Sequence, residues 1–188
     1  MVGKQIVKLN HDAYCWRYRT PVGFSDIVMT SDGNALTGLY FVGSRKVDGE
    51  ERDLPVFRKT CRWLDVYFSG RQPDFTPAYA IRGLTPFRRD VVEEMLKIPF
   101  GGTTTYGGIA RAIAKRRGLA RMSAQAVGGA VGWNPICLII PCHRVIGADG
   151  GLTGYGGGLE NKVALLALES PTVQACRKRA RARNQNLA

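Results

Sequence analysis

The sequence predicts an α+β protein, in which a small β-sheet with one helix precedes a mainly helical unit that contains a helix-turn-helix. Two observations lead to this prediction. The first third of the 188-residue chain reads as strands, and from about residue 54 the apolar residues recur at helical spacing. The segment RQPDFTPAY then predicts a boundary near residues 71–84. We expect a supporting unit over residues 1–84, a helical unit over 85–170 and a basic, flexible tail over 171–188.

The supporting unit is expected to start with a β-hairpin. Residues 22–28 and 35–42 are the predicted strands, and the sequence SDGN at 31–34 supplies the Asp-Gly pair that favours a tight turn. A helix should follow and end near Gly70, because glycine is common just past a helix C-terminus. The apolar face of that helix is formed by Val56, Phe57, Leu64, Tyr67 and Phe68.

Three helix starts follow in the helical unit. Thr85 is a good N-cap residue, and Pro86 suits the first helical position. Further starts lie at residues 103–105 and at Ser123, and the sequence KRRGLAR at 115–121 reads as a basic loop between them. Two short helices joined by such a turn form a helix-turn-helix, whose second helix would face DNA.

The second helix of this unit, SAQAVGGAVGW, is almost free of long side chains. A glycine inside a helix costs about 1 kcal/mol relative to alanine, and Gly128 and Gly129 are adjacent here. Small residues allow another backbone to approach closely. That neighbour could be DNA, the segment around Cys142 or another packed helix.

The charge distribution predicts a polyanionic partner. The net charge is +12; residues 1–85 carry 12 Lys and Arg against 9 Asp and Glu, whereas residues 86–188 carry 15 against 6. Part of the second excess lies in the tail, where such a run is usually just solvated. The five cysteines do not resemble a disulfide framework, and no signal peptide or long apolar run occurs, so we expect a cytoplasmic protein without membrane contact.

The stretch ICLIIPCHRVI, residues 136–146, contains the candidate chemistry. An apolar, strand-like segment runs into Pro141, and a thiol, Cys142, then stands beside an imidazole, His143. A reactive thiolate needs a neighbouring base or positive charge, and both are present. A buried, inert cysteine is the alternative, and a zinc site that also uses Cys137 is conceivable but lacks a fourth ligand and any CxxC pair.

Two features follow this stretch. Residues 147–158 contain seven glycines around Tyr155, without the P-loop or dinucleotide-binding spacing, which favours a flexible wall of a pocket. The last predicted helix, residues 160–169, ends on Glu169, whose charge opposes the helix macrodipole. A compensating partner, such as a histidine, is therefore expected.

Taken together, the motifs IPFGGTTTYGGIA, AVGGAVGWNP, IPCHRVIG and GLTGYGGGL resemble the O6-methylguanine-DNA methyltransferase family. The resemblance implies a ribonuclease-H-like fold for the N-terminal unit. It also implies DNA repair, in which the protein extrudes O6-alkylguanine from double-stranded DNA and moves the alkyl group irreversibly to its own Cys142. Such a protein acts once, needs no metal or other cofactor, binds DNA through the minor groove and works as a monomer.

Carried over residue by residue, the resemblance makes Cys142 the alkyl acceptor and His143 the base that acts on it through a bound water. Glu169 would orient the imidazole, and Asn134 would brace the turn that holds the thiol. Adjacent residues of an extended chain point to opposite sides, which suits a water between thiol and imidazole.

The same resemblance assigns residues to the base and to the DNA. Tyr106 would press the target phosphate and donate toward the guanine, Tyr155 would stack on it, and backbone groups at Val145 and Cys142 would read its edge. Gln125 stands where many relatives place an arginine that fills the gap in the duplex. The remaining residues assigned to the pocket are Gly156 and Gly157, and those assigned to DNA are Ala126, Arg121, Arg116 and Arg117, whose charges could replace the missing arginine.

Three other functions fit parts of the sequence. A non-catalytic damage binder would lack the cysteine, which this chain keeps. A basic helix-turn-helix regulator would suit the charge but has no need of a thiol beside an imidazole. A cysteine hydrolase would turn over and would need an oxyanion site, of which the sequence gives no sign.

Overall fold

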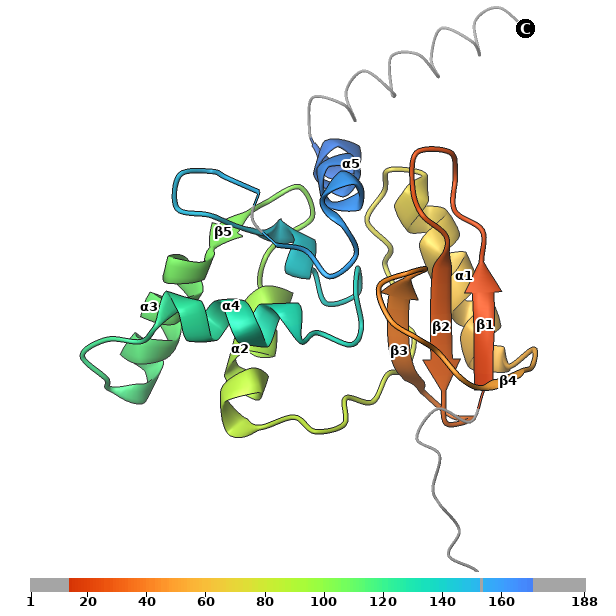
Figure 1. Cartoon of the computed structure of the whole chain (residues 1–188), viewed down its shortest axis with the longest axis horizontal. Coiled ribbons are helices and arrows are strands. Elements are labelled where there is room, and N and C mark those ends of the chain that lie inside the picture. Colours follow the sequence, from red (N-terminus) through yellow and green to blue (C-terminus); the bar gives the residue numbers. More distant parts are fainter. Residues whose placement is uncertain (1–13, 153, 171–188) are drawn as a thin grey trace, which may run out of the picture.

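The computed structural model describes residues 14–152 and 154–170. The predicted tail at 171–188 and the histidine His11 lie outside the described residues. Figure 1 shows a small sheet with one helix beside a group of helices, so the predicted α+β class is confirmed. The ribonuclease-H-like description of the first half stays a prediction.

The sheet consists of four strands in the order β3-β2-β1-β4. Their bounds are β1 Tyr14–Tyr18, β2 Ile27–Ser31, β3 Leu36–Phe41 and β4 Glu50–Glu51. The pairs β1–β2 and β2–β3 are antiparallel, and β4 pairs parallel to β1. In the hairpin turn, the Asp32 carboxylate accepts hydrogen bonds from the backbone of Asn34 and Ala35, each at 3.0 Å.

The prediction for the first strand of this hairpin was wrong at its start. The strand begins at Ile27, and Val22 is fully exposed in a turn closed by a hydrogen bond from Phe24 N to Pro21 O. Gly23 in that turn has a φ of 98°, a backbone conformation that interrupts an extended strand.

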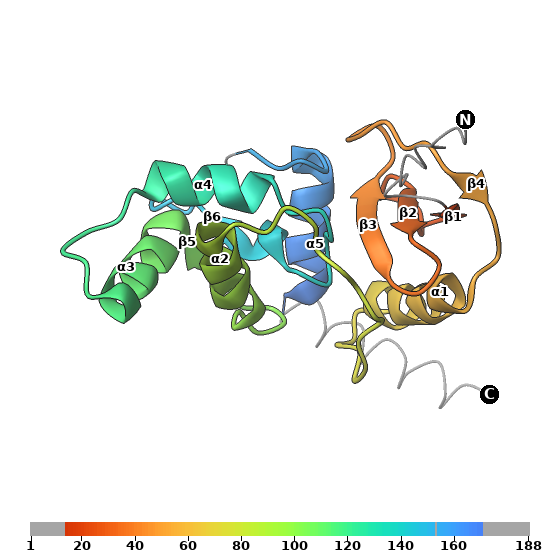
Figure 2. The same ribbon diagram turned by 90° about the horizontal axis from the view of Figure 1, so that it is seen from below.

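One helix, α1 Pro55–Phe68, lies against one face of the sheet (Figure 2). Its buried side chains recur at helical spacing, and Gly70 follows with a φ of 80°, so the predicted helix and its end are confirmed. With 14 residues it is the longest described helix, and no helix of the described residues is long and apolar enough to cross a membrane.

The free edge of β3 holds two later segments of the chain. Tyr79, in the connection between the two halves, forms a parallel bridge with Leu36, and Ile136 forms another with Leu39. The backbone N···O distances are 2.8 to 3.0 Å. An open strand edge has unpaired N–H and C=O groups, and here part of that edge anchors the segment that leads to Cys142.

The helical half contains α2 Pro86–Leu96, α3 Tyr106–Arg117, α4 Ala124–Gly132 and α5 Leu159–Glu169. The side-chain oxygens of Thr85, Thr105 and Ser123 accept backbone N–H groups at the starts of α2, α3 and α4, which confirms the three predicted starts. Two short strands, β5 Thr104–Thr105 and β6 Val145–Ile146, pair in parallel.

The basic stretch at 115–121 is not a loop throughout. Lys115, Arg116 and Arg117 form the last turn of α3, where positive charge complements the helix macrodipole. The helix ends at Gly118, which adopts the left-handed conformation with a φ of 66°. The link to α4 is therefore only residues 118–123, shorter than predicted.

The predicted strand before Pro141 was also wrong. Residues 137–140 form turns, Leu138 has a φ of 67°, and Cys142–Arg144 is one turn of 3-10 helix. Cys142 and His143 are thus not on extended backbone, and the expectation that they point to opposite sides of a strand loses its basis. The apolar composition reflects burial of this segment between the two halves.

Candidate active site

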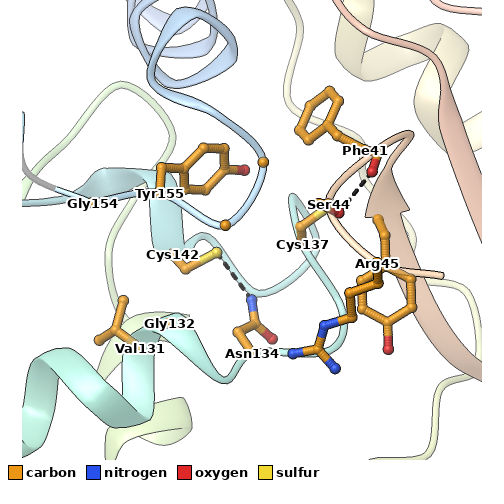
Figure 3. A pocket seen from close by; sticks show the side chains of 13 residues that line it. Phe41, Ser44, Arg45, Val131, Gly132, Asn134, Cys137, Cys142, Gly154 and Tyr155 are labelled. Carbon is orange, nitrogen blue, oxygen red and sulfur yellow. Dashed lines mark hydrogen bonds between the residues drawn. The ribbon is translucent and has the colours of Figure 1, made fainter.

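Asn134 holds the turn that presents Cys142. Its Nδ2 lies 3.2 Å from Ile136 O, 2.9 Å from Ile140 O and 3.1 Å from the Cys142 sulfur, and its Oδ1 accepts from Ile136 N. These bonds satisfy backbone groups that a strand would have paired, so the side chain takes the place of a sheet partner. Asn134 also touches the thiol itself, as Figure 3 shows.

His143 and Glu169 are in direct contact. The imidazole Nε2 lies 2.9 Å from Glu169 Oε1, and both side chains are fully buried. The unfavourable charge at the end of α5 thus has a histidine partner, as the sequence predicts. The other ring nitrogen, Nδ1, is buried and has no hydrogen-bond partner among the described residues.

Glu169 is the most heavily bonded group of the site. Besides His143, its carboxylate accepts from Arg144 Nε and Nη2 at 2.8 and 2.9 Å, from the Tyr67 hydroxyl at 2.6 Å and from Gly101 N at 3.2 Å. Arg144 also donates to Ile98 O at 2.8 Å. Burial acts to raise the pKa of Glu169, but the hydrogen bonds and charges of His143 and Arg144 outweigh it and lower the pKa to about 2. Glu169 is therefore an anion at neutral pH.

The thiol and the imidazole rest in their neutral forms. Burial raises the pKa of Cys142, although the Asn134 hydrogen bond and the charge of Lys162 act in the opposite direction. Burial also lowers the pKa of His143, against the effect of Glu169. The reactive thiolate therefore forms when the Cys142 proton moves to the imidazole, and the resting thiol is protected from oxidation.

Lys162 brings a further cation to the site. Its side chain is fully buried on α5, and Nζ donates to Val145 O at 2.8 Å. Burial lowers the pKa of Lys162, whereas the neighbouring Cys142 sulfur raises it. A positive charge here favours the thiolate over the thiol. The neighbouring apolar residue Val163 is 51% exposed, so the charged Lys162 is buried in place of its apolar neighbour.

A cavity of about 270 Å³ opens onto Cys142. Figure 3 shows Tyr155 above the sulfur and Asn134 below it, with Arg45 entering from the sheet half. The Arg45 guanidinium donates to Trp133 O at 3.3 Å. The other residues that line the cavity are Tyr40, Phe41, Ser44, Val131, Gly132, Cys137, Gly154, Gly156 and Gly157. The pocket therefore has walls from both halves, whereas the sequence suggested that the first half only supports the second.

Three of the residues predicted for the pocket, Tyr155, Gly156 and Gly157, line this cavity. The Tyr155 ring packs edge-on against Phe41, with 6.3 Å between ring centroids, and its hydroxyl is buried. A side chain at Gly157 would begin 2.5 Å from the Phe41 ring, so the loop can pass there only as glycine. Gly156 is exposed at the rim. This wall is shaped by an aromatic residue of the sheet half.

Val145 and Tyr106, both predicted to contact the base, belong to the region where β5 and β6 pair and do not line the cavity. The backbone N–H of Val145 donates to Cys142 O, and its carbonyl accepts from Lys162, so both groups already have partners. Tyr106 is the first residue of α3, and a methyl group on Gly128 would lie 3.8 Å from its ring. That is an ordinary van der Waals distance, so Tyr106 lies against α4 without requiring glycine at position 128.

Two of the residues predicted to meet DNA, Gln125 and Ala126, lie on α4. Gln125 and Ala126 are exposed in its first turn, and Gly129 is exposed with no atom within 4 Å of where its side chain would be. At Gly129, packing against another helix therefore does not explain the glycine. Arg121, just before α4, is exposed and makes no ion pair within the described part of the chain.

Arg116 and Arg117 differ from Arg121 in having acidic partners. Arg116 contacts Asp90 and Glu94, both at 2.6 Å, and Arg117 also pairs with Asp90. These carboxylates lie on α2 and offset the two positive charges. The pairs join α3 to α2 behind the exposed face of α4.

No zinc site forms at the thiol. Within residues 14–152 and 154–170, no three or more His, Cys, Asp or Glu side chains are placed to share a metal ion. Cys137, Cys142 and His143 thus do not act as a ligand set. Cys137 instead lines the cavity, and burial raises its pKa well above that of a free thiol.

Similarity to known proteins agrees with this geometry. The family model for the 6-O-methylguanine DNA methyltransferase DNA binding domain matches residues 86–171. A methylated-DNA–protein-cysteine methyltransferase of Mycobacterium leprae is 38% identical over 163 residues, which cover 85% of this chain and 94% of the relative. The chain belongs to the O6-methylguanine-DNA methyltransferase family. The family predicted from the sequence is thereby confirmed, and with it the class of DNA repair methyltransferase.

Other members of this family extend the match. The Methanosarcina acetivorans methyltransferase is 38% identical, with 81% of this chain and 95% of the relative covered. The crystal structure of Mycobacterium tuberculosis OGT in complex with DNA superposes with a TM-score of 0.71 at 39% identity, covering 84% of this chain and 92% of that one. The similarity therefore includes the sheet half as well as the helical half.

Some residues of the site were not predicted. Tyr67 has the spacing of an ordinary core residue of α1, and nothing local distinguishes it. Lys162 gave a weak signal, because it lies three residues before the buried Leu165 and therefore on the same helix face. Phe41 and Arg45 line the cavity only because the sheet half packs against the helical half, and nothing in the sequence around them indicates this.

Proposed function

We propose that Cys142 takes the alkyl group of an O6-alkylguanine in double-stranded DNA and is consumed in doing so. The observation that carries this proposal is a thiol at the cavity floor, held by Asn134 and adjacent to a buried His143–Glu169 pair. The sulfur attacks the alkyl carbon, a C–S bond forms, and the bond from carbon to O6 breaks with its electron pair left on the guanine. The resulting thioether does not hydrolyse, so each molecule acts once.

The proton of Cys142 passes to His143. Because Nε2 faces the Glu169 carboxylate, that nitrogen carries the hydrogen, and Nδ1 is left with a lone pair for the incoming proton. The buried Nδ1 is the polar group that a water between thiol and imidazole would satisfy. Glu169, saturated by donors, stays anionic and stabilises the imidazolium that forms.

The base enters the cavity by leaving the duplex, because the alkylated oxygen lies within the base stack. Tyr155 stacks on it, Gly156 and Gly157 keep the rim open, and the Val145 carbonyl reads its edge with the lone pair that Lys162 does not use. Tyr106 presses the phosphate and donates toward the guanine. Poor pairing of the alkylated base lowers the cost of extrusion.

The exposed face of α4 meets the minor groove. Its small side chains allow close approach, Gln125 enters the gap left by the extruded base, and Ala126 lies beside it. Arg121 supplies positive charge to the backbone phosphates. Arg116 and Arg117 act at longer range, because acidic residues of α2 already pair with them. We expect the protein to bind as a monomer and to act in the cytoplasm on chromosomal DNA.

Intact mass measurement tests the identity of the acceptor. The protein is incubated with a duplex that carries one O6-methylguanine, and a gain of one CH₂ should map to Cys142. Cys142→Ala should abolish the gain. Cys137→Ala is the matched control, because Cys137 lines the same cavity and should not be the acceptor.

The alternative functions give different results in the same assay. Tight binding of the lesion with no gain of mass would indicate a non-catalytic damage binder. Equal binding to methylated and unmethylated duplex with no gain would indicate a regulator. A gain that maps to Cys137 would contradict the assignment of Cys142.

A further inference from the structure

We propose that Tyr67, on α1 of the sheet half, is a positioning residue for the active site: its hydroxyl fixes the tautomer and orientation of His143. This inference rests on the proposed function, because it concerns the base that activates Cys142. Through Tyr67, the first half of the chain then influences the proton transfer from Cys142 to His143.

The three polar groups meet in a closed space. The Tyr67 hydroxyl donates to Glu169 Oε1 at 2.6 Å, and its oxygen lies 3.3 Å from His143 Nε2. Tyr67 is 1% exposed, and His143 and Glu169 are 0% exposed, so water does not compete for these contacts. The contact spans 102 residues between Tyr67 and Glu169 and joins the two halves.

The direction of the Tyr67 hydrogen bond reinforces the tautomer that Glu169 favours. The carboxylate can only accept, so the hydroxyl hydrogen points at Glu169, and the lone pairs of the hydroxyl oxygen are left for Nε2. Nε2 therefore faces two acceptors, Glu169 Oε1 and the Tyr67 oxygen. Both favour the tautomer with hydrogen on Nε2, and that tautomer leaves Nδ1 as the base.

Tyr67 stays a donor under all relevant conditions. Burial raises its pKa well above the ordinary value, and the negative charge of Glu169 adds to this effect. The other charged or titratable groups around the imidazole are Arg144 and Cys142 on the adjoining turn and Lys162 on α5. Neither cation can replace the hydroxyl as an acceptor for the Nε2 hydrogen.

The position of the hydroxyl is set by the packing of the Tyr67 ring. Trp63, one turn earlier on α1, stacks on it with 5.3 Å between centroids and an interplanar angle of 9°. Phe68 and Phe100 pack against it edge-on at 5.5 and 5.8 Å. A ring held on three sides cannot swing away, so α1 determines where the hydroxyl meets Glu169.

The need to balance the negative charge of Glu169 does not explain why a tyrosine hydroxyl lies beside it. Arg144 already contacts both carboxylate oxygens, and Gly101 N and His143 also donate to it. The added effect of the hydroxyl is its second contact, at Nε2. It also shares the negative charge of Oε1, so it moderates the pull of Glu169 on the imidazole proton.

The test compares Tyr67→Phe with Tyr18→Phe. Tyr18 is a matched control, because its hydroxyl donates at 2.7 Å to Asp65, a carboxylate on the other side of the same helix. Tyr67→Phe should lower the single-turnover rate of methyl transfer about tenfold, a part of the roughly 10²-fold or more that a well-positioned base contributes, without changing the affinity for the duplex. Tyr18→Phe should leave both unchanged.

The pH dependence separates positioning from packing. Without the hydroxyl, Glu169 holds the imidazolium more strongly, so the pKa of His143 rises and the acidic limb of the rate profile moves to higher pH. A purely structural role would lower the melting temperature and leave that limb in place. An unchanged limb together with an unchanged rate would overturn the proposal.

Nitrogen NMR gives a readout that does not depend on activity. The chain has two histidines, so His11→Gln leaves His143 as the one imidazole in the spectrum. The expected tautomer carries hydrogen on Nε2, with a mixture appearing in Tyr67→Phe. Hydrogen on Nδ1 in the otherwise wild-type protein would refute the inference even if Cys142 is methylated. If Cys142 is not methylated, the proposed function fails, and the spectrum still decides the role of Tyr67.

Discussion

The proton relay of Cys142, His143 and Glu169 differs from the exposed face of α4 in how its side chains are arranged. In the relay, Glu169 receives at least five hydrogen bonds, of which those from Tyr67, His143 and Arg144 are buried and that from Gly101 is part-buried. The α4 face presents Gln125 and small residues, with open space at Gly129. Proton transfer requires groups fixed before the substrate arrives, whereas a DNA-binding face must leave room for its partner.

This contrast ranks the effects of mutation. A change inside the relay leaves charges or donors buried without partners and should affect both rate and stability. A change on the α4 face removes contacts to DNA and should leave the fold intact.

Glu169→Gln should have the largest effect. The amide is similar in shape but cannot balance Arg144 or stabilise the imidazolium, so the methyl transfer rate should fall about 10²-fold and the free energy of unfolding by about 3 kcal/mol. Single-turnover kinetics and denaturant titration measure the two. Glu160→Gln, exposed in the first turn of the same helix, is the control. Equal behaviour of the two variants would refute the relay.

Acid should weaken the fold through the same carboxylate. The folded pKa of Glu169 is about 2, below the unfolded value of about 4.3. Its stabilising effect is therefore complete above about pH 5 and is lost as pH falls toward 2, a loss of about 3 kcal/mol. Denaturant titrations across this range should show a steeper decline for wild type than for Glu169→Gln. Parallel declines would mean that the carboxylate is not held as the structure indicates.

Asn134→Ala should have an intermediate effect. The change leaves Ile136 N and Ile140 O without their side-chain partner in a buried turn, at a cost of about 2 kcal/mol. Thermal unfolding and single-turnover kinetics should both respond, because the Cys142 sulfur loses its donor as well. Asn34→Ala, exposed in the β2–β3 turn, serves as the comparison and should leave the melting temperature and the methyl transfer rate nearly unchanged.

Changes on the α4 side should be the smallest and confined to DNA. Arg121→Ala should weaken duplex binding a few-fold and flatten the dependence of log K on log salt by about 0.9. Gln125→Arg should steepen the same slope by a similar amount. Arg62→Ala, exposed on α1, provides the comparison. If Arg121→Ala and Arg62→Ala behave alike, Arg121 does not contact DNA.

The parts of the fold that were predicted correctly have local causes. The starts of α2, α3 and α4 follow from Thr85, Thr105 and Ser123, whose side chains each accept the backbone N–H three residues later. The β2–β3 hairpin follows from Asp-Gly at its turn. Cys142, His143, Asn134 and Glu169 were chosen from a specific sequence motif, and the structure brings them together, although their catalytic roles stay predictions.

The errors have non-local causes. The segment before Pro141 has the composition of a strand, but its backbone groups form hydrogen bonds with the Asn134 side chain and with the edge of β3. The β3 contact involves Leu39, about 100 positions earlier, and cannot be read from the local sequence. Tyr67 was predicted only as a core residue, because an aromatic residue on an apolar helix face gives no sign of a polar partner 102 residues later. The pocket walls from the sheet half were missed for the same reason.

The most direct test of the central claim is a titration of lesion against protein. A fixed amount of protein is mixed with increasing amounts of duplex containing O6-methylguanine, and the repaired guanine is counted after the reaction stops. The account predicts a plateau at one repaired lesion per molecule of protein, with every molecule methylated at Cys142. Repair that continues beyond one lesion per molecule would contradict it.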